Sequence, residues 1–186
     1  MNDMVAHDIR NHEIVTGRLE QGHQVASGKN GDPRFPGGTL AMQISHFRQR
    51  GLDLEGYHRA TLNVSFAPRV CEIDPSKADF TFRKVRWHPV DPAEDFSFFH
   101  VFVRRHAGDL SWVPALIYYP HPETKPDHFQ PDGMLEILAV EKLRGLCYGD
   151  LIDVVLDLRQ VKILPTESRT IRGDNSVTRR PARFGK

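Results

Sequence analysis

Two side chains with neutral oxygen atoms, Thr61 and Asn63, stand two positions apart in the segment Thr-Leu-Asn-Val-Ser-Phe, residues 61–66. Polar and apolar residues alternate there, which predicts a strand whose apolar side chains face a core and whose polar side chains share the opposite face. A hydroxyl and a carboxamide oxygen on one face suit a hard cation such as Mg²⁺, which needs few protein ligands when substrate phosphates complete its shell. An ordinary half-exposed strand with a polar outer face gives the same alternation.

Glycine residues recur near the start of the chain, at Gly17, Gly22 and Gly28. A backbone without Cβ atoms can bring its N–H groups close to a phosphate, so Gly17 and Gly22 are candidates for phosphate binding. A hairpin turn has the same glycine spacing, and the spacing alone favours the turn.

A carboxylate, Glu136, interrupts the short apolar segment 134–139, which otherwise predicts a strand. A carboxylate buried in such a strand needs a partner or a chemical task. The loop before it, residues 120–133, contains Thr124 and several prolines, and loops of this length in a folded domain are commonly functional or disordered.

The elements that must position these residues belong to a chain of 186 residues with 39% hydrophobic residues, 26% charged residues and a net charge of +1. This composition is typical of a soluble globular protein of one domain. Two cysteines are too few for a disulfide scaffold. No apolar run is long enough for a signal peptide or a membrane span, so we expect a cytoplasmic protein. The phosphate-binding fingerprint of P-loop kinases is missing.

Short apolar or alternating segments separated by turn residues predict a mainly β protein. The expected strands are residues 13–18, 23–27, 61–66, 80–87, 96–104, 110–119, 134–139 and 151–158. Two short peripheral helices are expected at residues 39–50, with Thr39 as the N-cap, and at residues 140–146. Many short strands and few helices favour a β-barrel.

The two ends of the chain differ from the middle in composition. Residues 1–11 are polar and predict a flexible lead-in, and residues 12–165 form the expected barrel domain. Residues 166–186 carry six arginines and lysines and few apolar residues, which predicts a flexible basic tail with or without a partner. We expect the tail to be dispensable for folding because it offers little to bury.

Three blocks of sequence resemble the archaeal CTP-dependent riboflavin kinases, a family of small cradle-loop β-barrels. Their order along residues 12–158, more than any single motif, carries the resemblance. The blocks are Val15-Thr16-Gly17 with Gly22-His23-Gln24; Gly56-Tyr57 with Thr61-Leu62-Asn63-Val64; and Ala115-Leu116-Ile117 with Pro120, Thr124, Leu135-Glu136-Ile137-Leu138-Ala139, Lys142-Leu143-Arg144 and Gly149-Asp150.

This resemblance implies a six-stranded cradle-loop barrel that transfers a phosphoryl group from a nucleoside triphosphate, CTP in this family, to riboflavin and releases FMN. It implies that Thr61 and Asn63 hold Mg²⁺ and that Gly17 and Gly22 line a phosphate loop. It also places Glu136 and Thr124 at the flavin, with Glu136 accepting the proton of the attacking hydroxyl. Phosphoryl transfer of this kind depends mainly on positioning and charge neutralisation.

The segment between Gly17 and Gly22 departs from the closely spaced glycines of that family, because Arg18-Leu19-Glu20-Gln21 intervenes. Two functions therefore remain open. The first is a riboflavin-kinase-like enzyme, and the second is a non-catalytic barrel that binds a small ligand or a macromolecular partner. An open 17–22 loop with converging N–H groups favours the enzyme, whereas a segment filled by Arg18 and Glu20 favours the binding protein. Neither a membrane nor a nucleic acid is an expected partner.

Overall fold

A computed structural model describes residues 9–108, 111–125 and 130–166. Most of the expected lead-in and nearly all of the expected basic tail lie outside these residues. The described elements are η1 (Ile9–Asn11), β1 (His12–Glu20), α1 (Thr39–Arg48), β2 (Leu62–Ser65), β3 (Val70–Ile73), η2 (Pro75–Lys77), β4 (Phe80–Val85), β5 (Glu94–Arg105), β6 (Val113–Pro120), β7 (Met134–Ala139), β8 (Leu151–Asp157) and β9 (Val161–Leu164).

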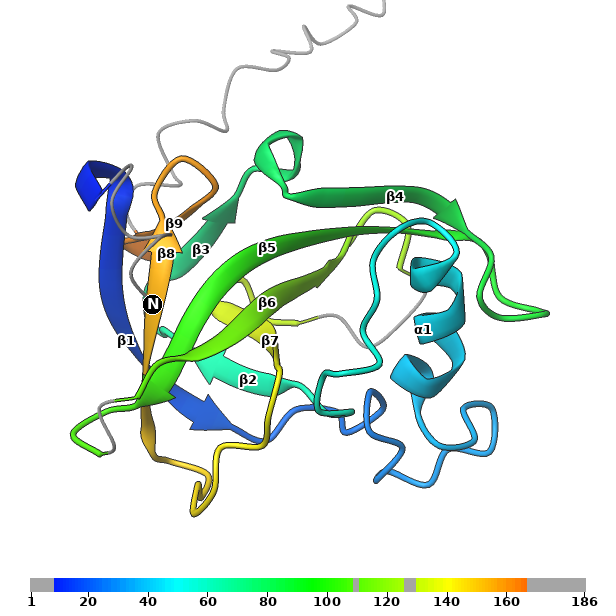
Figure 1. Cartoon of the computed structure of the whole chain (residues 1–186), viewed down its shortest axis with the longest axis horizontal. Helices are drawn as coiled ribbons and strands as arrows, with labels where there is room; N and C mark the ends of the chain where they lie inside the picture. Colours follow the sequence, from blue (N-terminus) through cyan, green and yellow to red (C-terminus); the bar gives the residue numbers. More distant parts are fainter. Residues whose placement is uncertain (1–8, 109–110, 126–129, 167–186) are drawn as a thin grey trace, which may run out of the picture.

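Six strands close into an antiparallel barrel in the order β5-β6-β7-β2-β1-β8, and β8 pairs back onto β5. Strand β4 lies outside the closed barrel and pairs antiparallel with the first part of β5 (Figure 1). This closure confirms the expected six-stranded barrel, and β2, β6, β7 and β8 are the strands predicted at residues 61–66, 110–119, 134–139 and 151–158.

Strands β5, β6 and β7 bury residues on both of their faces, which explains the nearly continuous apolar run of β6 and β7 and the buried aromatic residues of β5. Alternate residues of β7, Leu135, Ile137 and Ala139, point into the barrel, while Leu138 belongs to a second core outside it. That second core packs the outer face of β4–β7 against helix α1. Strand β1 buries only one face, so its outer positions can be charged.

Helix α1 covers the second core with its apolar stripe, and Phe47 is fully buried against Phe82, Phe96 and Phe98. The predicted N-cap at Thr39 is wrong. Gly38 occupies that position, and the first helical N–H groups donate to the carbonyls of Val25 and Ala26 instead of to a capping side chain. The preceding loop thereby fixes the start of α1.

Two other predicted elements are wrong. Residues 140–146 form bends and turns instead of a helix, because Val140, Leu143 and Leu146 pack against the barrel core and the Val140 N–H donates to Pro114 O at 3.0 Å. Residues 23–27 form no strand; they enter a turn closed by a hydrogen bond from Gly28 N–H to Val25 O. In both segments, contacts with distant residues outweigh the local pattern.

A small second sheet formed by β3 and β9 escaped the sequence analysis, which predicted an irregular segment at residues 68–79. Each strand has four residues, too few for a clear alternation. Val161 of β9 belongs to the barrel core, and Cys71, Ile73 and Ile163 pack against it. Within the described residues, no helix is long and apolar enough to cross a membrane.

Candidate functional site

Asn63 of β2 and Glu136 of β7 lie directly opposite each other in the antiparallel ladder. Residues paired in this way point to the same face of the sheet, here the outer face of the barrel. The apolar neighbours Val64, Leu135 and Ile137 point into the barrel, as the alternation of residues 61–66 predicted. The polar face of β2 is covered, however, because Asn63 and Ser65 are each only 8% exposed.

The carboxamide oxygen of Asn63 is buried and has no hydrogen-bond partner within the described residues. Gly22 covers this carboxamide so closely that a Cβ on the glycine would lie 2.6 Å from its atoms. A glycine is therefore required at position 22. An unpaired buried acceptor costs about 1–3 kcal/mol, so this oxygen is available to a water molecule, an ion or a ligand.

Glu136 is 9% exposed, and its burial raises the pKa of the carboxyl group above its usual value. Four neighbours oppose that effect, one of them the nearby imidazole of His23. Lys125 Nζ lies 3.8 Å from Oε1, Gln130 Nε2 donates to Oε1 at 2.7 Å, and the Thr61 side chain donates to the same carboxylate. The structure thus brings four of the predicted site residues, Thr61, Asn63, Gly22 and Glu136, together.

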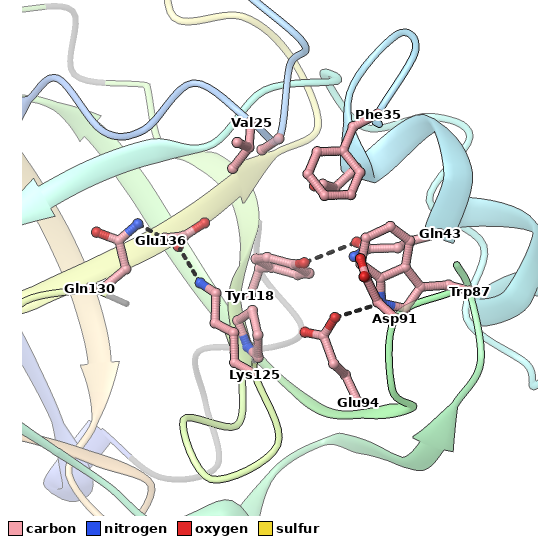
Figure 2. A pocket seen from close by; sticks show the side chains of 13 residues that line it. Val25, Phe35, Gln43, Trp87, Asp91, Glu94, Tyr118, Lys125, Gln130 and Glu136 are labelled. Atoms are coloured by element: carbon pink, nitrogen blue, oxygen red, sulfur yellow. Dashed lines mark hydrogen bonds and ion pairs between the residues drawn. The ribbon is translucent and has the colours of Figure 1, made fainter. Parts of the chain in front are cut away.

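A cavity of about 40 Å³ extends from Glu136 between the outer face of the barrel and α1. In Figure 2, Glu136 and the ammonium end of Lys125 lie on one side of Tyr118, and Trp87 lies on the other side. The volume holds a few water molecules, since one water needs about 10–15 Å³ by this measure. A larger ligand therefore requires the surrounding loops to move outward.

Two buried hydrogen bonds fix the far wall of the cavity. Trp87 Nε1 donates to Glu94 Oε1 at 2.9 Å, and the Tyr118 hydroxyl donates to Gln43 Oε1 at 2.9 Å. The sequence analysis assigned none of these residues to a site, and it also missed Lys125 and Gln130. Only Gln43 gave a local signal, as a polar residue in the apolar stripe of α1; the other residues meet through the tertiary fold.

Two predicted site residues lie away from this cluster. Gly17 is in the middle of β1, paired with Ile152, and a Cβ there would approach Val64 Cγ1 to 2.6 Å inside the barrel. Its role in this structure is close packing of the barrel interior. Thr124 lies in the turn before Lys125, where its hydroxyl accepts a hydrogen bond from Asp95 N–H at 2.9 Å.

The oxygen atoms of Thr61 and Asn63 fit a small hard cation such as Mg²⁺, because both are neutral, adjacent to a carboxylate and, at Asn63, unpaired. The residues that the structure describes contain no group of three or more His, Cys, Asp or Glu able to hold a metal ion of any kind.

Comparisons with protein-family models, with curated proteins and with solved structures found no match to this chain. The fold and the site geometry therefore carry the functional argument.

Proposed function

We propose that the protein is a Mg²⁺-dependent phosphotransferase of the riboflavin-kinase type, which uses a nucleoside triphosphate, CTP by resemblance, to convert riboflavin into FMN. The closed six-stranded barrel is compatible with the cradle-loop fold of that family. The observation that carries the proposal is the unpaired Asn63 Oδ1, which is buried and lies opposite Glu136, a residue that lines the cavity.

The chain supplies three groups for this chemistry. Thr61 and Asn63 provide oxygen ligands for a cation, which when bound neutralises phosphate charge. Glu136 can accept the proton of a substrate hydroxyl, and its raised pKa brings it closer to the range in which a general base works at neutral pH. The covered outer face of the barrel excludes water from these groups.

A thermal-shift and turnover experiment tests the proposal. Riboflavin, FMN, CTP and ATP are added separately and in pairs, with and without Mg²⁺. At ligand concentrations near 100 Kd we expect the melting temperature to rise by about 5 °C or more, because such binding adds about 2.7 kcal/mol of stability. FMN formation measured by chromatography should require Mg²⁺.

Asn63→Ala should abolish the Mg²⁺-dependent formation of FMN and leave the melting temperature of the free protein close to that of the wild type. The variant removes a cation ligand that has no partner in the folded chain, so it breaks no internal hydrogen bond of that oxygen. Ser65→Ala is the matched control, since Ser65 lies on the same outer face of β2 and is equally buried. Equal turnover in the Asn63→Ala and Ser65→Ala variants contradicts the proposal.

The conformation of β1 favours a second candidate function, a non-catalytic barrel that binds a small ligand or a macromolecular partner. Residues Gly17 to Glu20 belong to the strand, and the Leu19 N–H donates to Asp150 O at 2.8 Å. These backbone groups form the ladder and do not converge on a phosphate. A ligand-induced shift without turnover supports this second candidate, and turnover excludes it.

A further inference from the structure

Lys125 is mostly buried at the cavity, with its side chain 15% exposed, yet its ammonium group makes no hydrogen bond within the described residues. The nearest carboxylate oxygen, Glu136 Oε1, is 3.8 Å away, which is too far for a hydrogen bond. That oxygen already accepts from Gln130 at 2.7 Å. The lysine therefore presents a positive charge and three donors beside the cavity.

The turn that carries Lys125 is held firmly by its own backbone. The N–H groups of Thr124 and Lys125 donate to the carbonyl of His121 at 3.0 and 3.1 Å. The Thr124 hydroxyl joins the same carbonyl to Asp95 N–H of β5. These hydrogen bonds attach the backbone at Lys125 to β5 at the rim of the barrel.

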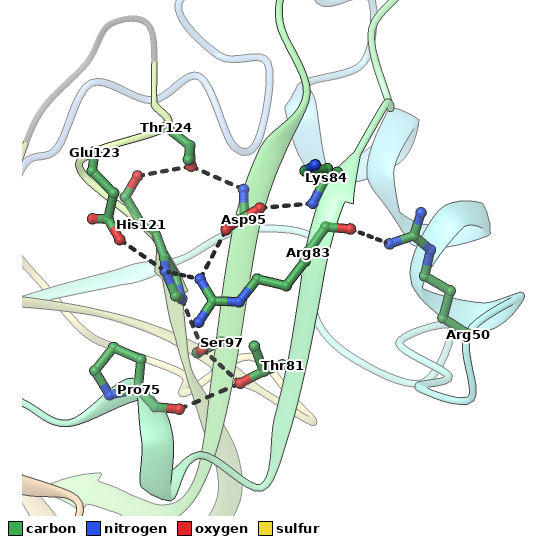
Figure 3. A network of polar contacts seen from close by, with 10 residues as sticks. All are labelled: Arg50, Pro75, Thr81, Arg83, Lys84, Asp95, Ser97, His121, Glu123 and Thr124. Atoms are coloured by element: carbon green, nitrogen blue, oxygen red, sulfur yellow. Dashed lines mark hydrogen bonds and ion pairs between the residues drawn. The ribbon is translucent and has the colours of Figure 1, made fainter.

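The ring of His121 anchors this turn in the protein interior, where the residue is 1% exposed. Its Nε2 lies 2.8 Å from Ser97 Oγ, and its Nδ1 lies 3.2 Å from Arg83 Nη1 (Figure 3). Nδ1 also lies 3.3 Å from Glu123 Oε1, so an arginine that donates and a carboxylate that accepts both contact this nitrogen. The sheet formed by β4 and β5 therefore fixes the position of Lys125 relative to Glu136.

We propose that Lys125 binds a phosphate group of the ligand by exchanging its long contact with Glu136 for hydrogen bonds to phosphate oxygens. Glu136 lies opposite an unpaired acceptor, Asn63 Oδ1, and forms a 3.8 Å ion pair with Lys125 Nζ, whose N–H donors make no hydrogen bond within the described residues. A phosphate with its cation satisfies both, since the cation takes the acceptor and the phosphate oxygens take the donors. The inference rests on the proposed function and names the phosphate-binding residue of that same site.

Isothermal titration of the full chain with CTP, FMN and riboflavin, in the presence of Mg²⁺, tests this role. Lys125→Met should weaken the binding of the phosphorylated ligands by about 10- to 100-fold, which is the usual worth of a hydrogen bond to a charged group. Binding of riboflavin, which has no phosphate, should change less than about twofold. A loss confined to CTP or to FMN identifies whether the donor or the product phosphate contacts the lysine.

Two further variants serve as controls for loss of the positive charge and for removal of a lysine elsewhere in the protein. Lys125→Arg keeps the charge and the donors and should retain most of the affinity for the phosphorylated ligands. Lys162→Met removes an exposed lysine on β9, outside the cavity, and should bind all three ligands like the wild type. If Lys125→Met binds both CTP and FMN with wild-type affinity, this inference is overturned and the proposed function is not affected. A wild-type protein that binds neither phosphorylated ligand overturns the proposed function as well.

Discussion

Glu136 combines two properties at the scale of a single residue: it is buried, and its pKa is raised chiefly by that burial, against the opposing effects of Lys125 and Gln130. A carboxyl group whose pKa is higher in the folded protein than in the unfolded chain lowers stability as the pH rises through the folded pKa. The charged form of Glu136 is therefore less favourable in the folded protein than in the unfolded chain. Such a cost is typical of residues kept for chemistry.

Glu136→Gln should consequently raise the melting temperature at pH 7 and leave it nearly unchanged at pH 4, where the unfolded and folded carboxyl groups are both largely protonated. Each kcal/mol relieved should raise the melting temperature by roughly 2–4 °C. The same variant should slow FMN formation by about 100-fold or more, because an amide cannot accept the hydroxyl proton.

Melting curves at the two pH values, together with a turnover assay, measure both effects. Glu13→Gln, at an exposed position of β1, is the control and should show neither of them. A Glu136→Gln variant that is less stable than the wild type at pH 7 contradicts the argument from burial.

At the scale of elements, the turn between β6 and β7 depends on a neutral His121. Burial lowers the pKa of His121, the Glu123 carboxylate beside the ring opposes this, and the Arg83 guanidinium lowers it further. Asp95, which pairs with Arg83 at 2.8 Å, is the other charged group facing the ring. Because the folded pKa lies below the unfolded value, the stability contributed by His121 is complete above about pH 6.5 and is lost as the pH falls.

His121→Asn should therefore destabilise the protein more at pH 7.5 than at pH 5, where the wild type has already lost part of this contribution. Melting temperatures of the variant and the wild type across pH 5–8 give the difference directly. His100→Asn is a control with the opposite pH dependence, since the hydrogen bond to Asp79 raises the pKa of His100 whereas that of His121 is lowered. Its destabilisation should be larger at pH 5, and parallel curves for the two variants would contradict the assignment.

At the scale of the whole molecule, the folded unit extends through β9. This strand pairs with β3, and Val161 is 1% exposed in the barrel core. The Thr166 hydroxyl then donates to Pro68 O. The chain therefore contributes to the fold at least as far as Thr166.

Truncation after Thr166 should leave the melting temperature nearly unchanged, because the residues removed include few that are apolar. Truncation after Gln160 should lower it by more than about 5 °C, since it exposes Val161 and leaves β3 unpaired. Scanning calorimetry of the two truncated proteins measures the difference. A large loss in the longer one would show that the segment after Thr166 packs on the barrel.

The sequence by itself determined where the barrel strands lie and that β2 has one polar and one apolar face. Period-two alternation is a local property, so it can be recognised in the sequence before the partner strands are known. It also identified Glu136, because a charge inside an apolar strand is conspicuous without any tertiary information. The sequence also singled out Thr61, Asn63 and Gly22 as candidates, and the structure places these residues beside Glu136.

Only the tertiary structure decided that the polar face of β2 is buried, that Gly17 packs inside the barrel, and that Lys125 reaches Glu136. It also decided the cavity wall of Trp87 and Tyr118 and the pairing of β3 with β9. These features join residues far apart in the sequence. Their free energy comes from burial and pairing between segments, which no local pattern of residues records.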